Sequence, residues 1–284
     1  MNQFEQFQNS LIIKNISENN FSLEPDLKYF VGNTPHGGYL MAIMHKALVS
    51  SLPHSTAISS SVQYLERIEA KEITLKVEIL KISRGSSSGI VKIVQDEKVC
   101  ALFTGTCSDF EYMKGFDGLE TPIPNIYLES DRDDYVELNF DKISKGFTPS
   151  FIKQLNCSVH PDHAWWNREI SSDKAEARCS AFLELDGGIP DQFALSFYSD
   201  ILPPVVSNKY GALGWIPTIT LTTHIRQMPT TNTLFADFKA SDINKGYFEQ
   251  DCNIWDLNEN LVASSRQLTR ILKSEEKLSK SKLT

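Results

Sequence analysis

The order of the predicted elements constrains the fold most, because a helix followed by several strands occurs twice along the chain. Residues 36–50 place apolar side chains 3.6 residues apart behind a glycine pair, which predicts a helix. Residues 189–205 predict a second helix. Each helix is followed by four segments with the apolar alternation of strands. The predicted strands are 56–66, 72–83, 88–95 and 98–107 in the first half, and 215–227, 233–242, 247–256 and 260–272 in the second.

The two halves also match at nearly constant spacing, which indicates an internal duplication. Gly85 corresponds to Gly246 at an offset of 161, and residues 99–101 correspond to 261–263 at an offset of 162. A lone helix beside a strand meander buries its apolar stripe only if the sheet curls around it. The sequence therefore predicts an α+β fold of two tandem units, each a curled antiparallel sheet wrapped around a central helix. The expected parts are 1–110, a connecting segment 111–150, 151–273 and a flexible tail 274–284.

Composition excludes several classes of function. Lys and Arg number 28 against 36 Asp and Glu, a net charge of −8, so a nucleic-acid partner is not expected. No apolar run reaches the ~18 residues of a membrane span, and the first residues do not resemble a secretory signal, so we expect a cytoplasmic protein. The peroxisomal alternative rests on Ser281-Lys282-Leu283, which stops one residue short of the end. Five cysteines without a CxxC pair favour reduced, structural thiols.

Five segments carry a resemblance to a known family: PHGGYLMAIMHKAL, SVQYLERIEA, FYSDILPP, WIPTITL and LVASSRQL. They resemble the thioesterase-like superfamily typified by acyl-CoA thioesterase II, over roughly 28–110 and 155–272. The resemblance implies a double hot-dog fold and hydrolysis of an acyl-CoA to a carboxylic acid and coenzyme A. It implies no metal or redox cofactor, coenzyme A being part of the substrate.

The same resemblance implies which residues act. In that family a water is activated by an Asp from the second central helix with a Thr and a Gln from the second sheet, and these roles fall on Asp200, Thr218 and Gln267. The glycine pair of the first helix corresponds to Gly37 and Gly38. The Gln that follows this pair in acyl-CoA thioesterase II is Tyr39 here.

The residues themselves allow this chemistry but leave alternatives open, because thioester hydrolysis needs a base, groups that aim the water and donors for the oxyanion. Asp200 shares a helix side with Phe193 and Phe197, so burial should raise its pKa; alternatively, it only ends the helix before the prolines. Strand alternation places Thr218 on one face with Thr220, Thr222 and His224, where a Thr could serve packing alone. Gln267 alternates with Ala263, Ser265 and Thr269, and could instead face solvent.

Candidate substrate contacts lie at the start of the first helix and on basic side chains. Backbone N–H groups of Gly38 and Tyr39 could bind the thioester carbonyl, or simply form a tight turn. His36 could bind phosphate or polarise a carbonyl, or cap the turn, and Gly37 lies beside it. Several cations could meet the phosphates of coenzyme A, although solvated surface positions explain them equally well. They are Arg84 and Arg226, with Arg67, Lys81 and Lys245 as further candidates.

Other motifs point to weaker alternatives. Residues 85–89 match GxSxG, but they lie between two strands, which favours a hairpin over a nucleophilic Ser87. His160 and His163 have no further ligand nearby, so no metal site is expected. The first half places Leu40, Ile58 and Gly105 where the second has its polar trio, which predicts one site per chain.

Four hypotheses follow for the function. The leading one is an acyl-CoA thioesterase, with an acyl-CoA as its small-molecule partner and possible assembly into a homo-oligomer through exposed sheet edges. A non-catalytic acyl- or acyl-CoA-binding protein is the alternative from another class. A third hypothesis is an acyl-CoA hydratase or dehydratase, but the sequence does not show the Asp and His pair, spaced within one short motif, that such hot-dog proteins use. An α/β-hydrolase using Ser87 is disfavoured by the strand pattern.

Overall fold

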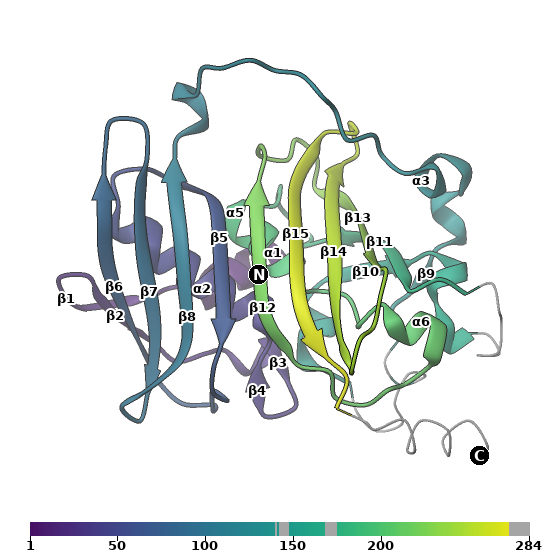
Figure 1. Ribbon diagram of the computed structural model, residues 1–284, viewed down its shortest axis with the longest axis horizontal. Helices are drawn as coiled ribbons and strands as arrows, with labels where there is room; N and C mark the ends of the chain where they lie inside the picture. The colour runs from purple at the N-terminus through teal and green to yellow at the C-terminus, as the bar shows by residue number, and fades with distance from the viewer. Residues whose placement is uncertain (140, 142–147, 168–174, 273–284) are drawn as a thin grey trace.

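The computed structural model describes residues 1–139, 141, 148–167 and 175–272. Within these residues one antiparallel sheet of 13 strands runs through the molecule (Figure 1). Helices α2 (Gly37–Ser51) and α5 (Gln192–Tyr198) lie side by side behind it. The predicted α+β architecture of two sheet-and-helix units is confirmed.

The N-terminal unit supplies the sheet order β1-β2-β6-β7-β8-β5. Its four predicted strands are found to within two residues at each end. The sequence did not reveal β1 and β2, which extend the sheet beyond β6. It also did not reveal the short hairpin β3–β4 before α2, or the first helix, α1. The bounds are α1 Gln3–Ser10, β1 Lys14–Ser17, β2 Asn20–Leu23, β3 Phe30–Val31, β4 Thr34–Pro35, β5 Thr56–Tyr64, β6 Ile73–Ile82, β7 Ser87–Gln95 and β8 Lys98–Ser108.

The C-terminal unit repeats this order as β12-β15-β14-β13-β11-β10-β9, and β12 pairs with β5 to join the two halves. Its four predicted strands are also found, and three further strands extend the sheet beyond β13. The bounds are β9 Val136–Glu137, β10 Asn156–Val159, β11 Arg178–Glu184, β12 Thr218–Ile225, β13 Thr233–Ala240, β14 Tyr247–Asp256 and β15 Leu261–Arg270.

The two units share an irregularity that fixes their correspondence. The β7–β8 register shifts between Ile93 and Val94, and the β14–β15 register shifts between Ile254 and Trp255. Aligning these shifts matches Ala101 to Ala263, at the offset of 162 found in the sequence. The cross-strand pair Gly89–Gly105 of the first unit then matches the pair Gln250–Gln267 of the second.

The second central helix is much shorter than predicted. α5 covers Gln192–Tyr198 rather than 189–205, and α6 (Val206–Tyr210) follows it as a separate turn. The Asp191 carboxylate caps its start by accepting from two backbone N–H groups. Consecutive prolines at 203 and 204 stop the chain from continuing as helix, because proline lacks an N–H and restricts the residue before it. The prediction of one long helix was wrong.

The connecting segment covers the outer face of the C-terminal sheet. It crosses from β8 to α3 (Asn125–Glu129), as Figure 1 shows. Ile123 and Tyr135 from this segment pack in one cluster with Phe182, Phe235 and Trp255 on strands β11, β13 and β14. Burial of these aromatic rings fastens the connection to the sheet. The predicted flexible tail, 274–284, lies outside the described residues.

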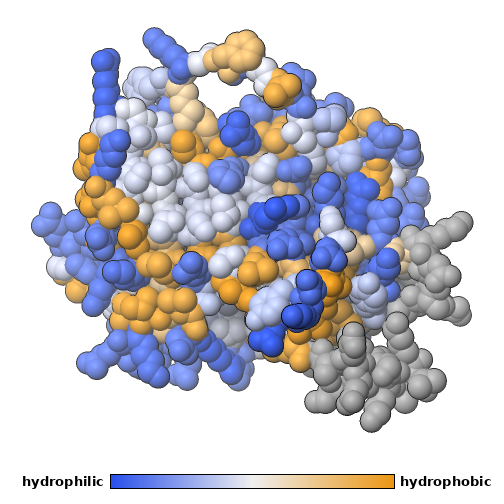
Figure 2. All heavy atoms as spheres, in the orientation of Figure 1, coloured by the Kyte–Doolittle hydropathy of each residue, from blue (hydrophilic) through white to orange (hydrophobic). Residues whose placement is uncertain are grey.

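Around the strands where the two units meet, the outer face of the sheet carries small hydroxyl side chains. Figure 2 shows it as a pale area around the meeting strands of the two units. The Thr222 hydroxyl donates to Ser61 at 2.9 Å across the β12–β5 seam, and Ser88 and Thr106 are 3.0 Å apart on β7 and β8. All five cysteines are free and buried, as the sequence predicted. Among the described residues, no helix has the length and apolar character needed to cross a membrane.

Candidate active site

A cavity of about 810 Å³ lies at the seam between the two units. Its walls come from the β3–β4 hairpin, the start of α2, the end of β5, the segment after α5, and strands β12 and β15. Asp200, Thr218 and Gln267 all line it, together with apolar side chains that include Leu40, Phe151 and Trp215. The structure thus brings the three residues implied by the resemblance into one cavity.

Asp200 is a carboxylate of this cavity whose two oxygens each accept a hydrogen bond. It lies two residues beyond the end of α5. The backbone N–H of Gly38 donates to its Oδ2 at 3.1 Å, and the Thr218 hydroxyl donates to its Oδ1 at 3.4 Å. Burial raises the pKa of Asp200 to about 7, and the two hydrogen bonds partly oppose that rise. The direction is the one that the sequence predicted, and the carboxyl group can therefore exchange a proton near neutral pH.

The glycine pair lets α2 approach this carboxylate. A Cβ atom on Gly37 would lie 2.5 Å from Asp200 Oδ2, and one on Gly38 would lie 2.5 Å from the carbonyl oxygen of Phe197. Any larger residue would push the two helix ends apart. The sequence left open whether the start of this helix binds a thioester carbonyl or is a plain tight turn; in the structure the two glycines make room for Asp200 and the end of α5.

A β-bulge turns Thr218 into the cavity. Thr218 pairs with Thr269 but Thr220 pairs with Leu268, so Ile219 is an extra residue in β12. The alternation changes phase there. Thr218 therefore faces inward with Leu221, whereas Thr220 faces outward. The prediction that Thr218 shares a face with Thr220, Thr222 and His224 was wrong, because it assumed a regular strand.

Gln267 projects inward from β15 together with Ala263, Ser265 and Thr269, the residues with which it alternates, since all four are buried. Its Oε1 atom is buried and has no hydrogen-bond partner among the described residues. The other end of the amide, Nε2, is the atom left to face the cavity. The alternative of a solvent-facing Gln267 is contradicted by its 5% exposure.

His36 and Tyr64 complete the polar surroundings of Asp200. His36 Nε2–H donates to the backbone oxygen of Asp200 at 3.0 Å and lies 3.7 Å from Oδ2. Burial lowers the pKa of His36 to about 4, so the ring is neutral at pH 7. His36 occupies the N-cap position of α2 without a side-chain capping bond. The Tyr64 hydroxyl donates to the Gly37 carbonyl at 2.7 Å. Tyr64 is the last residue of β5 and lines the cavity; it lies within the segment SVQYLERIEA, but no role was predicted for it from the sequence.

Four predicted substrate contacts lie elsewhere or are otherwise engaged. The Gly38 N–H donates to Asp200, so it does not point freely at a carbonyl. Tyr39, proposed for its backbone N–H, is not among the residues that line the cavity, and its buried side chain donates from its hydroxyl to the Ser10 carbonyl at 2.9 Å. Arg84 lies in the β6–β7 turn and Arg226 follows the last residue of β12, while Thr218 is its first. Eight strand residues span about 26 Å, so Arg226 lies at the opposite end of β12 from Thr218 and Asp200. Arg67 does line the cavity.

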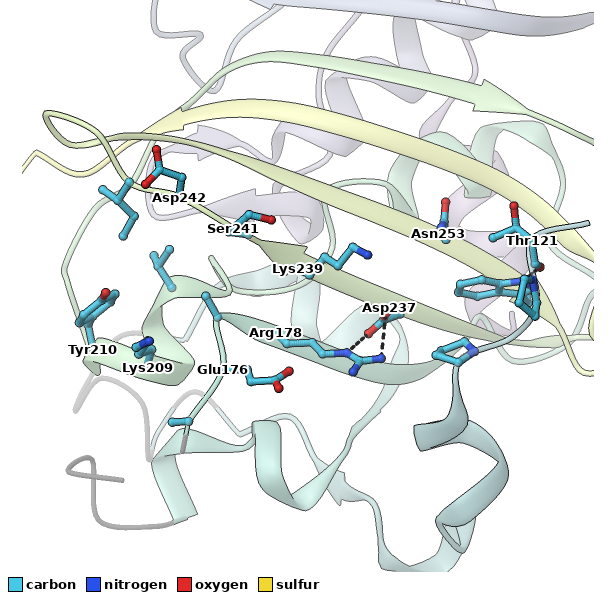
Figure 3. A pocket seen from close by; sticks show the side chains of 18 residues that line it. Thr121, Glu176, Arg178, Lys209, Tyr210, Asp237, Lys239, Ser241, Asp242 and Asn253 are labelled. Atoms are coloured by element: carbon cyan, nitrogen blue, oxygen red, sulfur yellow. Dashed lines mark hydrogen bonds and ion pairs between the residues drawn. The ribbon is translucent and has the colours of Figure 1, made fainter. Parts of the chain in front are cut away.

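A second cavity of about 810 Å³ lies on the outer face of the C-terminal unit (Figure 3). Its central charges are already paired. Arg178 forms two hydrogen bonds with Asp237, at 2.7 and 3.1 Å, and the Ser180 hydroxyl also donates to Asp237. Lys239 points into the same space from β13. Neither Asp200 nor its partners reach this cavity.

The weaker motifs have structural explanations. Ser87 is fully buried in β7, with its hydroxyl 2.9 Å from His54 Nδ1, so it cannot meet a substrate. His163 Nδ1 accepts from the Ser180 N–H at 3.0 Å, and Ser130 lies 2.9 Å from His160 Nε2. No cluster of three metal-binding side chains is present in the described part of the chain.

Two curled sheets joined edge to edge, with paired central helices inside, define a double hot-dog protein. Similar solved structures support this class. They include a candidate thioesterase II from Thermobifida fusca YX (21% identity, TM-score 0.79, covering 94% of this chain and 98% of that one). A hot-dog protein of unknown function from Alicyclobacillus acidocaldarius has 18% identity and a TM-score of 0.80, covering 95% and 98%. TesB2, an acyl-CoA thioesterase II from Mycobacterium marinum, has 13% identity and a TM-score of 0.72, also covering 95% and 98%.

Family models identify the chain more closely. Residues 27–108 match the acyl-CoA thioesterase N-terminal domain, and residues 132–271 match the acyl-CoA thioesterase C-terminal domain. The chain therefore belongs to the acyl-CoA thioesterase family. No curated protein matches its sequence.

Proposed function

We propose that the protein hydrolyses an acyl-CoA thioester to a carboxylic acid and free coenzyme A. The observation that carries the proposal is a buried carboxylate with a pKa of about 7, set in a largely apolar cavity beside a hydroxyl and an amide. An apolar wall suits an acyl chain, and Arg67 at the same cavity suits an anionic coenzyme A group.

The proposed step is direct attack by water. Asp200 takes one proton from the water. The other water proton stays on the oxygen and donates a hydrogen bond to the Thr218 oxygen, while Gln267 Nε2–H donates to the water oxygen. The remaining lone pair attacks the thioester carbonyl carbon. Collapse of the tetrahedral intermediate breaks the C–S bond, and the thiolate takes up the proton. No covalent enzyme intermediate is needed.

Thiol release from a panel of short, long and aromatic acyl-CoAs tests the proposal. We expect Asp200→Asn to lower kcat by roughly 10²-fold or more, the scale for loss of a general base. The wild-type kcat/KM should rise with pH through about 7, as Asp200 loses its proton. Turnover that survives the substitution would overturn the role of Asp200. Acyl-CoA binding without turnover by the wild type would favour the non-catalytic alternative.

A further inference from the structure

Two buried glutamines face each other directly across strands β14 and β15. Gln250 pairs with Gln267 in the sheet register, and both project to the inner face, with exposures of 1% and 5%. Directly opposed side chains in a sheet have Cβ atoms about 5 Å apart, well within reach of two glutamine amides. Only Gln267 lines the cavity; Gln250 lies one strand farther from it.

The orientation of the Gln250 amide is fixed by the backbone. The N–H of Val205 donates to Gln250 Oε1 at 2.9 Å. Because a backbone N–H can only donate, the oxygen of this amide must face Val205, and Nε2 must point away from it. Val205 belongs to the segment that follows Asp200, so Gln250 ties that segment to β14.

This arrangement leaves a buried donor and a buried acceptor on neighbouring side chains. Gln250 Nε2 and Gln267 Oε1 each lack a hydrogen-bond partner among the described residues. Such groups are costly when left unpaired, and most are satisfied by protein or by bound water. If the Gln267 amide group were rotated by about 180°, so that Nε2 and Oε1 exchanged places, its NH₂ group would face Gln250 Nε2. Two hydrogen-bond donors would then oppose each other.

We propose that Gln250 is a positioning residue that sets the orientation of the Gln267 amide. Gln250 Nε2–H donates to Gln267 Oε1, directly after a small side-chain rotation or through one bound water. The chain of donors then runs from Val205 N–H to Gln250, from Gln250 to Gln267, and from Gln267 Nε2–H into the cavity. The kinetic consequence rests on the proposed hydrolase function, in which Gln267 donates to the attacking water.

The contact itself is tested without any assay of activity, by a double-mutant cycle on thermal unfolding. Gln250→Leu and Gln267→Leu should each lower the Tm, because each leaves the other amide unpaired. The double variant should lose less than the sum of the two single losses. Additive losses would overturn the proposed contact.

The kinetic role is tested by the same variants. Gln250→Leu should lower kcat about tenfold with little change in KM, since it misaligns the water but not the substrate. In a Gln267→Leu background it should have no further effect on kcat. Gln95→Leu is the matched control: Gln95 is another buried glutamine, 6% exposed, that bonds backbone groups of residues 69 and 71 in the N-terminal unit. It should lower the Tm and leave kcat unchanged.

Gln250→Glu gives a signature that a purely structural role would not produce. While the introduced carboxyl group is protonated, it can still accept from Val205 and donate to Gln267, whereas the ionised carboxylate cannot donate. We expect this variant to lose turnover at alkaline pH, where the wild type stays on its plateau. A plateau in both would overturn the proposal. An unchanged kcat in Gln250→Leu, with Asp200→Asn inactive, would overturn the positioning role alone; an active Asp200→Asn would instead overturn the proposed mechanism.

Discussion

The N-terminal and C-terminal units fill one corresponding position inside the sheet with opposite kinds of side chain. In the first, the cross-strand pair Gly89–Gly105 lies under Leu48 from α2, and a Cβ atom on Gly105 would come within 2.5 Å of that leucine. In the second, the matching pair is Gln250–Gln267. α5 ends at Tyr198, so polar side chains from the sheet extend where a longer helix would pack.

The difference shows how a duplicated fold acquires one site. A 15-residue helix fills the interior of the first unit with apolar side chains, and its strands use glycine to accept them. A seven-residue helix in the second unit leaves volume beside its end. Asp200, Thr218 and Gln267 occupy the edge of that volume, and the start of the longer helix closes the site from the other unit.

The largest expected effect is on the free energy of unfolding, and its source is the buried carboxyl group of Asp200 in the C-terminal unit. Burial raises the pKa of Asp200 from 3.8 to about 7, so the folded state binds a proton more tightly than the unfolded state. Stability contributed by this group is therefore lost as the pH rises through about 7. Asp200→Asn removes the penalty and should stabilise the protein at pH 8 by up to about 4 kcal/mol. Denaturant unfolding at pH 8 and pH 4 checks this, because the difference should shrink to less than about 1 kcal/mol at pH 4.

A methyl group at the start of α2 should separate catalysis from folding. A Cβ atom on Gly37 would occupy space 2.5 Å from Asp200 Oδ2. We expect Gly37→Ala to lower kcat by about 10²-fold, equal to about 2.7 kcal/mol, because it displaces the carboxylate. Steady-state kinetics on an acyl-CoA measures the change. An unaltered kcat would contradict the close approach of the two helix ends.

The corresponding crowding inside the N-terminal unit should affect only stability. Gly105→Ala introduces a Cβ atom at the same 2.5 Å separation, here against Leu48 Cδ2. The expected cost is about 1–3 kcal/mol, typical of an overpacked core, with kcat unchanged in the folded enzyme. Calorimetry and kinetics on one preparation test both parts. A selective loss of kcat would mean that the first unit takes part in the chemistry at this position.

The smallest expected effect is on the KM for an acyl-CoA, and it should distinguish two arginines that lie at opposite ends of the joined strands. Arg67 lines the cavity and Arg226 does not. Arg67→Ala should raise the KM for an acyl-CoA about threefold, in line with an exposed ionic contact of less than 1 kcal/mol. Arg226→Ala should leave it unchanged. The reverse result would place the coenzyme A group at the far end of β12.

Sequence patterns located the structural elements correctly wherever the apolar residues recur with a regular strand or helix period. Alternation located the eight central strands, and the duplication offset agrees with the matching register shifts at Ala101 and Ala263. The resemblance, not periodicity, singled out Asp200, Thr218 and Gln267. Their roles stay a prediction, although the structure brings them together.

What the sequence did not reveal depends on local irregularity or on distance in space. One extra residue, Ile219, reverses the face of Thr218, and no propensity signals a bulge there. Arg226 looked suitable by charge, but its position along β12 separates it from the cavity. Gln250 carries no motif; only its pairing with Gln267 and its bond to Val205 identify it.

The pairing of β5 with β12 has a consequence for substrate access. Five residue pairs, from Thr220–Gln63 to His224–Ser59, join the two units into one sheet. A hinge at this seam would break a ladder of backbone hydrogen bonds, so the halves cannot swing apart to admit a ligand. Entry and exit must instead leave this ladder intact. The lining of the cavity includes exposed residues of the β3–β4 hairpin, Gly32 and Asn33, and of the segment before β12, Gly214 and Trp215.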